Sequence, residues 1–403
     1  MQKKETYEWG EGVYTLLSWF KKEKVKNARV LVAGAGALGN EVVKNLALFG
    51  IGHIYVVDFD RIEISNLTRS VLFREEDAYN HSYKSEIVAK RAMEINPQIK
   101  VVPIVGNLYS EVGFGLYKSV DVIIGCLDSR IARYWLNKLA MRAGKTWIDG
   151  SIENMTGVVR VYTPGVSCYE CGLSREEFNN IMLRTGCADV VRMQGNAGRV
   201  ATTPISASII GAMQVQEAMK IIHLSEGDTE EVPFKTLQGK MLRYEGMTNS
   251  VNIYKYASWK STCPAHEEWS NIVKAESLSA EDTVDTVLKT LKSILNVNAL
   301  EINMRNNKFI DKIVSDKPEK EFMVKIPESQ LDDYIANNEE LRKLSYKTIF
   351  HKDFIENIDE TFPYKDMSLK DIGIPLFDIM QVSTEKGQYF VELTKDASVF
   401  NLA

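Results

Sequence analysis

The chain has 403 residues, 45% of them hydrophobic, which predicts sizeable cores in one large α/β unit and a smaller second unit. Its 49 basic and 54 acidic residues nearly balance, and no basic block or stripe points to nucleic acid. The N-terminal residues carry no apolar signal core, and no apolar run is long enough to cross a membrane. Five cysteines in so long a chain do not make a disulfide framework, so we expect a cytoplasmic protein whose thiols bind metal or react.

Near the N-terminus, residues 13–26 predict an amphipathic helix with lysines on its solvated face. An apolar strand at 30–33 then meets the glycine-rich sequence GAGALG, a helical pattern that stops at Gly50, and a second apolar strand that ends at Asp58. This succession of strand, glycine turn, helix and strand is typical of the opening of a nucleotide-binding α/β sheet.

The three glycines of the turn have distinct expected functions. Gly34 permits the tight turn, Gly36 lets backbone N–H groups approach a phosphate, and Gly39 lets the helix lie close to the strand. Asp58 falls where a ribose-binding carboxylate is expected, and the N-terminus of the helix offers N–H donors to an anion. The alternative is a steric turn without a ligand.

Strands and helices continue to alternate beyond this stretch, which predicts a mainly parallel, doubly wound sheet. The expected strands are 100–104, 121–125, 145–149 and 157–163. The expected helices are 84–96, which stops at Pro97, then 130–143, and a long helix that begins at Pro204 and is capped by Thr202 or Thr203.

A polar loop after Asp58 adds groups that a plain dinucleotide site does not need. Asp60 is followed by Asn66 and Arg69, and an arginine can donate two hydrogen bonds to phosphate oxygens at once. Lys84, at the start of its helix, could place an ammonium near a triphosphate. A solvated loop with a surface salt bridge is the alternative.

Asp128 comes just past the carboxyl end of a predicted parallel strand, where such sheets bind ligands. A carboxylate there can hold Mg²⁺ against phosphate oxygens. The alternative is a helix cap, and one side chain could do both.

Cysteine and histidine occur in two pairs with a two-residue gap. Cys168 and Cys171 form the first pair, and Cys263 and His266 form the second. Three thiolates and one imidazole make a closed tetrahedral zinc site, which would join two distant segments structurally. A redox pair and unlinked core thiols are the alternatives.

Two cysteines remain. Cys126 ends an apolar strand and is interpreted as a small core residue. Cys187 lies in polar, loop-like sequence near Arg184 and Arg192, so it is either a nucleophile with a lowered pKa or an inert thiol.

From about Arg29 to His266 the chain resembles the ThiF/MoeB/HesA family, which shares the fold of the ubiquitin-activating enzymes. The sequences that carry the resemblance are GAGALGNE, VVDFDRIEISNLTR, CLDSRIAR, CYEC and CPAH, with the lysine at position 84. The resemblance implies an ATP- and Mg²⁺-dependent adenylyltransferase with a Rossmann-like fold. Such enzymes attach AMP to the C-terminal carboxylate of a ubiquitin-like or sulfur-carrier protein and release pyrophosphate.

The resemblance also implies a function for each matching residue. The nucleotide loop and the ribose-binding acid are matched by Gly34, Gly36, Gly39 and Asp58. The ATP-phosphate cluster is matched by Asp60, Asn66, Arg69 and Lys84, and the Mg²⁺-binding acid by Asp128. The Zn²⁺ ligands are matched by Cys168, Cys171 and Cys263, with His266 where many relatives have a fourth cysteine. Cys187 resembles the cysteine that in some members accepts the activated acyl group as a thioester.

The chain departs from the family in two places. Many relatives carry an arginine in the N-terminal helix that reaches the ATP of the partner subunit in a homodimer, whereas residues 1–26 contain none. Either Lys3, Lys4 or Lys22 replaces it, or catalysis lacks that contribution. Ser70 follows Arg69 where a glutamine is usual.

Sequence character changes near residue 277, which divides the chain into an adenylation domain, 1–276, and a small α+β domain, 277–403. The second domain is expected to contain a helix followed by strands at 299–304, 308–314 and 321–326 and a helical stretch at 330–344. Its end resembles the ubiquitin-fold domain, a β-grasp domain that in ubiquitin-activating enzymes recruits a conjugating enzyme. A packing or dimer-supporting domain is the alternative.

The leading hypothesis is therefore an adenylating enzyme for a ubiquitin-like protein, with onward transfer through Cys187 open. A nicotinamide- or flavin-linked oxidoreductase on the same glycine loop is the second hypothesis, and it gives Asn66, Arg69 and Asp128 no use. A non-catalytic scaffold that binds a ubiquitin-like protein is the third, favoured by the absent N-terminal arginine.

Overall fold

The computed structural model describes residues 9–10, 12–186, 202–224, 233–267, 269, 271–305, 307–316, 319–343 and 349–402. The chain forms two compact units. The first contains Met1–Gly106 and Ser119–Glu268, and the second contains Asn107–Lys118 and Trp269–Ala403. None of the helices in the described part of the chain is both long and apolar enough to cross a membrane.

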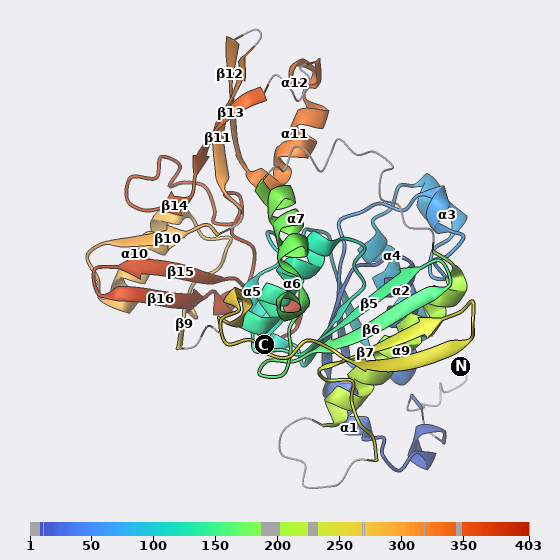
Figure 1. Ribbon diagram of the computed structural model, residues 1–403. Helices are drawn as coiled ribbons and strands as arrows, with labels where there is room; N and C mark the ends of the chain where they lie inside the picture. Colours follow the sequence, from blue (N-terminus) through green and yellow to red (C-terminus); the bar gives the residue numbers. More distant parts are fainter. Residues whose placement is uncertain are drawn as a thin grey trace, which may run out of the picture. The chain divides into compact units, whose positions relative to one another are not determined.

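An eight-stranded sheet forms the centre of the first unit, in the order β3-β2-β1-β4-β5-β6-β7-β8. Its strands β5, β6 and β7 lie side by side in Figure 1. The parallel strands are β1 (Arg29–Ala33), β2 (His53–Val57), β3 (Lys100–Ile104), β4 (Val122–Gly125) and β5 (Trp147–Glu153). The antiparallel strands are β6 (Thr156–Tyr162), β7 (Lys240–Glu245) and β8 (Ser250–Lys255). The prediction of a mainly parallel sheet is confirmed. Nearly every position of β1, β2 and β4 is buried, as expected for strands covered on both faces.

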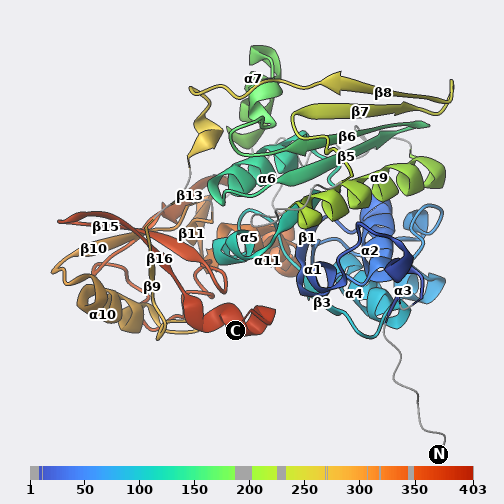
Figure 2. The ribbon, with the colours of Figure 1, turned by 90° about the horizontal axis from the view of Figure 1, so that it is seen from below.

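Helices pack on this sheet and complete its core. The main ones are α2 (Ala37–Phe49), α4 (Lys84–Ile95), α6 (Arg130–Arg142) and α9 (Pro204–His223). Helix α9 contacts β4, β5 and β6, and Figure 2 shows it beside α2 and β6, while α4 packs on β2 and β3. The predicted cap of α9 is confirmed at Thr203, whose Oγ1 accepts a hydrogen bond from Ser206 N at 3.2 Å.

The first unit contains further helices in the described part of the chain. They are η1 (Tyr14–Leu16), α1 (Lys22–Asn27), η2 (Ile64–Asn66), α3 (Glu75–Tyr79), η3 (Glu170–Gly172), α7 (Arg175–Gly186) and η4 (Pro264–His266).

The prediction of one amphipathic helix over residues 13–26 is wrong. Only η1 and α1 are helical there, and Leu17 and Lys21 have extended backbone angles. The ring of Tyr14 stacks on Phe49 at the end of α2, with ring centroids 5.7 Å apart, and Phe20 also packs there. Aromatic packing onto the end of α2 therefore decides the path of this segment, and a single helix face does not.

The described residues of the second unit form two sheets. The order of the five-stranded sheet is β14-β10-β15-β16-β9, and that of the three-stranded sheet is β12-β11-β13. The strands of the larger sheet are β9 (Ile272–Lys274), β10 (Leu300–Asn303), β14 (Asn357–Ile358), β15 (Ile379–Thr384) and β16 (Gly387–Glu392). Helix α10 (Val284–Leu295) buries its apolar side chains in one core with this sheet.

The smaller sheet contains β11 (Phe309–Asp316), β12 (Glu319–Pro327) and β13 (Ile349–Ile355). It shares a separate small core with α11 (Leu331–Asn337), and α12 (Glu339–Lys343) adds Leu341 to that core. The remaining short helices of this unit are α5 (Phe114–Ser119), η5 (Glu328–Gln330) and η7 (Thr394–Phe400).

A short segment from between β3 and β4 belongs to this second unit. The N–H of Phe114 donates to Asp378 Oδ1 at 2.8 Å, and the N–H of Gly115 donates to Phe377 O at 3.0 Å. A Cβ added to Gly113 would lie 2.1 Å from Leu376 O, so the two backbones are in close contact. Residues 107–118 are thus part of the packing of the second unit.

Candidate functional site: the carboxyl edge of the parallel sheet and a Cys/His cluster

The carboxyl ends of β2, β1 and β4 lie side by side at one edge of the sheet. Gly34 N donates to Val57 O and Cys126 N donates to Ala33 O, both at 2.8 Å, so the three connections begin at the same level. The strand order changes direction between β1 and β4, because β2 and β3 follow on one side and β5 on the other. Open α/β sheets bind ligands in the crevice at such a point.

The three glycines of the first connection differ in what surrounds them. Gly34 has φ +100°, and a Cβ on it would lie 2.5 Å from Cys126 O. A Cβ on Gly39 would lie 2.0 Å from Gly34 O, whereas one on Gly36 has no heavy atom of the described residues within 4 Å. Gly34 and Gly39 are therefore required by the protein's own packing. Gly36 faces open space at the N-terminus of α2, which lacks a side-chain cap and can offer N–H groups to an anion.

Asp58 follows β2 and fixes the two neighbouring connections. Its Oδ2 accepts a hydrogen bond from Ala35 N at 2.7 Å, and its Oδ1 accepts one from Asp60 N at 2.8 Å. Burial raises the pKa of this carboxyl, although the charge of Lys84 and the two backbone N–H groups act in the opposite direction. The carboxylate therefore ties the glycine turn to the polar loop.

Asp60 and Lys84 form an ion pair beside Asp58. The distance from Lys84 Nζ to Asp60 Oδ2 is 2.6 Å, and Lys84 N donates to Asp60 O at 2.9 Å. Asn66 and Arg69 instead make their hydrogen bonds inside their own loop. Asn66 Oδ1 accepts from Glu63 N, and Arg69 Nη1 donates to Ser65 O, both at 2.9 Å. The structure thus brings Asp58, Asp60 and Lys84 together, and it links Asn66 and Arg69 to the adjoining turn.

Asp128 is exposed two residues beyond Cys126. The interpretation of Asp128 as the helix cap is wrong, because Ser129 occupies the N-cap of α6 and its Oγ accepts a hydrogen bond from Ala132 N at 3.2 Å. The residue that caps the helix is therefore the neighbour of Asp128, and within the described part of the chain the Asp128 carboxylate has no hydrogen-bond or ion-pair partner.

Sequence reasoning missed a buried polar group beside this strand end. Arg133, Asp149 and Arg160 form ion pairs there, and Gln214 of α9 donates to Gly125 O. The sequence gives little signal for it, because its four members come from α6, β5, β6 and α9, without a characteristic spacing. The one signal in the sequence was Asp149 itself, a charged residue at the end of the predicted strand 145–149.

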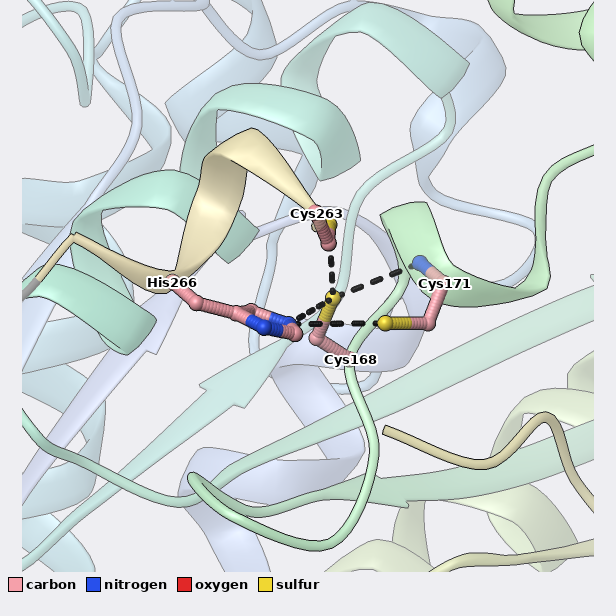
Figure 3. A group of neighbouring side chains, drawn as sticks. All are labelled: Cys168, Cys171, Cys263 and His266. Carbon is pink, nitrogen blue, oxygen red and sulfur yellow. Dashed lines mark hydrogen bonds between the residues drawn. The ribbon is translucent and has the colours of Figure 1, made fainter. Parts of the chain in front are cut away.

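The four residues of the two Cys/His pairs converge (Figure 3). One ligand atom from each lies within 4.8 Å of the others. Cys168 Sγ is 3.8 Å from Cys263 Sγ, and His266 Nε2 is 3.2 Å from Cys168 Sγ and 3.4 Å from Cys171 Sγ. The ring of Trp259 stacks on the imidazole of His266.

This donor set fits zinc. Three thiols and one imidazole are typical of closed structural zinc sites, and here they join the segment after β6 to η4. Burial raises the pKa of the Cys168 and Cys263 thiols and lowers that of His266. A bound cation would favour the thiolates, which burial without a metal disfavours.

The other two cysteines have different outcomes. Cys126 packs against the main core, and burial raises the pKa of its thiol, so its interpretation as a core residue is confirmed. Cys187 lies outside the described residues, as do Lys3 and Lys4.

Several proteins of known activity are similar to this chain. It is 31% identical over 252 residues to the adenylyltransferase and sulfurtransferase MOCS3 of Anopheles gambiae, covering 62% of this chain and 52% of that protein. It is 29% identical over 235 residues to the sulfur carrier protein adenylyltransferase of Thermus thermophilus, covering 57% and 79%. It is 37% identical over 161 residues to the catalytic subunit of the NEDD8-activating enzyme E1 of Schizosaccharomyces pombe, covering 38% and 36%. The chain spans about half the length of the first two curated relatives it matches.

A solved structure shares the fold. The crystal structure of E. coli MccB with ATP superposes with a TM-score of 0.50 at 23% identity, covering 66% of this chain and 75% of that one. Residues 14–265, more than half of the chain, match the ThiF family. The chain belongs to the ThiF family.

Proposed function

We propose that this protein uses ATP and Mg²⁺ to adenylate the C-terminal carboxylate of a ubiquitin-like or sulfur-carrier protein. The observation that carries the proposal is the carboxyl edge of β1, β2 and β4. An uncapped helix N-terminus, the group of Asp58, Asp60 and Lys84, and the exposed Asp128 all occur at this edge. The relatives named above are adenylyltransferases or activating enzymes, which favours this function over an oxidoreductase on the same glycine loop.

In the proposed reaction a carboxylate oxygen of the substrate attacks the α-phosphorus of ATP. The new oxygen–phosphorus bond makes an acyl adenylate. The bond between the α-phosphorus and the oxygen that bridges it to the β-phosphorus breaks, and pyrophosphate leaves. A general base is not needed, because a C-terminal carboxylate is already ionised at neutral pH. The main obstacle is repulsion between the attacking carboxylate and the phosphate oxygens, so positive charge and N–H donors are the groups that accelerate the step.

Each part of the edge has a proposed function in that step. The N–H groups at Gly36 hold phosphate oxygens, and Asp58 binds the ribose hydroxyls. Lys84, held by Asp60, and Arg69 offset the charge of the triphosphate. Asp128 holds Mg²⁺, which when bound neutralises phosphate charge and orients the pyrophosphate for departure.

The remaining parts of the proposal concern structure and partners. Zn²⁺ on Cys168, Cys171, Cys263 and His266 has a structural function, because all four positions are filled by protein ligands. Cys187 is a candidate to accept the activated acyl group as a thioester. We also propose a cytoplasmic homodimer whose second unit docks a conjugating enzyme.

ATP–pyrophosphate exchange tests the proposal directly. The full chain is incubated with ATP, Mg²⁺, labelled pyrophosphate and a panel of ubiquitin-like and sulfur-carrier proteins. We expect label to enter ATP only with a matching carrier protein, and Asp128→Ala to abolish the exchange. Glu94→Ala changes an exposed acid at the far end of α4 and serves as the control. Mass spectrometry with and without reductant then reveals any Cys187 adduct.

A non-catalytic scaffold is the competing function, favoured by the absence of arginine from residues 1–26. It predicts binding of a carrier protein without any pyrophosphate exchange, and a binding affinity that Asp128→Ala leaves unchanged.

A further inference from the structure

The buried ion pairs beside the end of β4 contain more positive than negative charge. Asp149 is fully buried, and it accepts from Arg133 Nε at 2.8 Å and from Arg160 Nη1 at 3.1 Å. Two guanidinium groups share one carboxylate, and the side chains of Arg133 and Arg160 are only 12% and 23% exposed. Burying an excess charge costs free energy that an apolar cluster would avoid, so stability alone does not explain this arrangement.

Arg133 differs from Arg160 in its second contact. Its Nη2 donates to the carbonyl oxygen of Leu127, and also to Gly150 O at 3.3 Å. Leu127 is the residue immediately before Asp128. Arg133 therefore links a fully buried anchor, Asp149, to the backbone that carries the exposed carboxylate.

The same connection is held on its other side by α9. Gln214 is fully buried, and its Nε2 donates to Gly125 O at 2.9 Å and to Ile148 O at 3.2 Å. A Cβ on Gly150 would lie 2.3 Å from Gln214 Oε1, so this amide fits tightly. Two carbonyl groups of the connection are thus held by side chains, that of Gly125 by the fully buried Gln214 and that of Leu127 by the largely buried Arg133.

This support contrasts with the freedom of Asp128. Its carboxylate is exposed, and Ser129 has taken the position of the helix cap. A fixed backbone that carries an exposed carboxylate is expected of a metal ligand that is oriented before the cation binds. Such preorganisation lowers the free-energy cost of binding.

We propose that Arg133, locked by Asp149, is a positioning residue that aims the Asp128 carboxylate at Mg²⁺. The proposal rests on the proposed function, in which Asp128 holds the cation. Arg160 also binds Asp149 but makes no hydrogen bond to the Leu127 carbonyl. It therefore adds positive charge to the cluster and does not orient the Asp128 carboxylate.

The test compares Arg133→Lys with Arg160→Lys in the full chain. Each change keeps a positive charge beside Asp149 and removes the planar guanidinium. One ammonium cannot reproduce the separate bonds that Arg133 makes to Asp149, Leu127 and Gly150. We expect Arg133→Lys to raise the Mg²⁺ concentration for half-maximal pyrophosphate exchange at least tenfold, and Arg160→Lys to change it less than threefold. The KM for the carrier protein should stay unchanged in both.

Amide hydrogen exchange without nucleotide provides a second readout. The peptide that covers residues 125–129 should exchange faster in Arg133→Lys and at the wild-type rate in Arg160→Lys. Thermal unfolding of both variants shows whether a difference in exchange merely reflects a difference in global stability. Equal Mg²⁺ shifts in the two variants, or no shift in Arg133→Lys, would overturn the proposal. If the wild type itself shows no pyrophosphate exchange, the proposed function has failed. Hydrogen exchange then still decides whether Arg133 holds the connection, and equal rates in the two variants refute it.

Discussion

The carboxyl edge of the sheet and the Cys/His cluster belong to the same unit and are built in opposite ways. At the edge, buried groups fix the backbone while the groups that would meet a ligand stay accessible, as with Asp128 and the open space at Gly36. In the cluster the four ligand atoms converge on each other, and the two Cys168 and Cys171 side chains are buried. The first arrangement suits a ligand that enters and leaves, and the second suits an ion that stays. The predictions below test this difference.

The largest effect is expected from removing one ligand of the proposed zinc site. Cys171→Ser removes one ligand from the cluster. The cluster joins two segments far apart in the sequence, since the contacting residues Cys168 and Cys263 are 95 positions apart. We expect the free energy of unfolding of the full chain to fall by several kcal/mol, because structural zinc contributes roughly 10 kcal/mol in small zinc domains. Thermal unfolding and elemental analysis for zinc provide the measurement.

The control for this prediction is Cys126→Ser, which changes a thiol of the core outside the cluster. It should retain the zinc and lose only about 1 kcal/mol, a common cost of a core substitution. The assignment of the cluster would be contradicted if the wild type, as purified, contained no zinc and Cys171→Ser were as stable as the wild type.

A pair of glycine substitutions separates packing from ligand binding within the edge itself. Gly39→Ala should destabilise the chain by about 3 kcal/mol or more, since its Cβ would overlap Gly34 O and overpacking a core typically costs 1–3 kcal/mol. Gly36→Ala meets no atom of the described residues and should leave the unfolding temperature nearly unchanged. It should weaken ATP binding at least tenfold, because the methyl group occupies the space in front of the helix N-terminus.

Thermal unfolding and equilibrium binding of ATP check both variants. If Gly36→Ala binds ATP as tightly as the wild type, phosphate does not approach this turn.

The two regions also differ in how well the sequence predicted them. The Cys/His cluster followed from two short pairs, because a gap of two residues places both side chains of a pair on one ion. The glycine turn and Asp58 were equally local. The grouping of Arg133, Asp149 and Arg160 was not predictable, because it depends on α6, β5 and β6 meeting in the folded sheet.

Other elements escaped prediction for physical reasons of the same kind. The backbone of residues 107–118 packs into the second unit through Gly113 and Asp378, contacts that join positions more than 260 residues apart. The N-terminal segment looked helical from its spacing, but Tyr14 and Phe20 pack on Phe49. In both cases tertiary contacts outweighed the local pattern.

The smallest expected effect is a pH dependence at Asp58, where ligand binding and stability change in opposite directions. Burial raises the pKa of this carboxyl above its ordinary value of 3.8. The charge of Lys84 opposes that shift, and the charge of Asp60 adds to it. Ribose binding needs the ionised form, so ATP affinity should be complete above the raised pKa and decline as the pH falls through it.

The contribution of Asp58 to stability has the opposite sign. The folded chain binds this proton more tightly than the unfolded chain does. Asp58 therefore increases the free energy of unfolding as the pH falls from the raised pKa toward 3.8. Asp58→Asn removes the titrating group, so the difference between variant and wild type isolates both effects. ATP binding and denaturant unfolding across this pH range give the measurement. If the affinity of the wild type and of Asp58→Asn declines in parallel on acidification, a different group controls nucleotide binding, and Asp58 only ties the glycine turn to the polar loop.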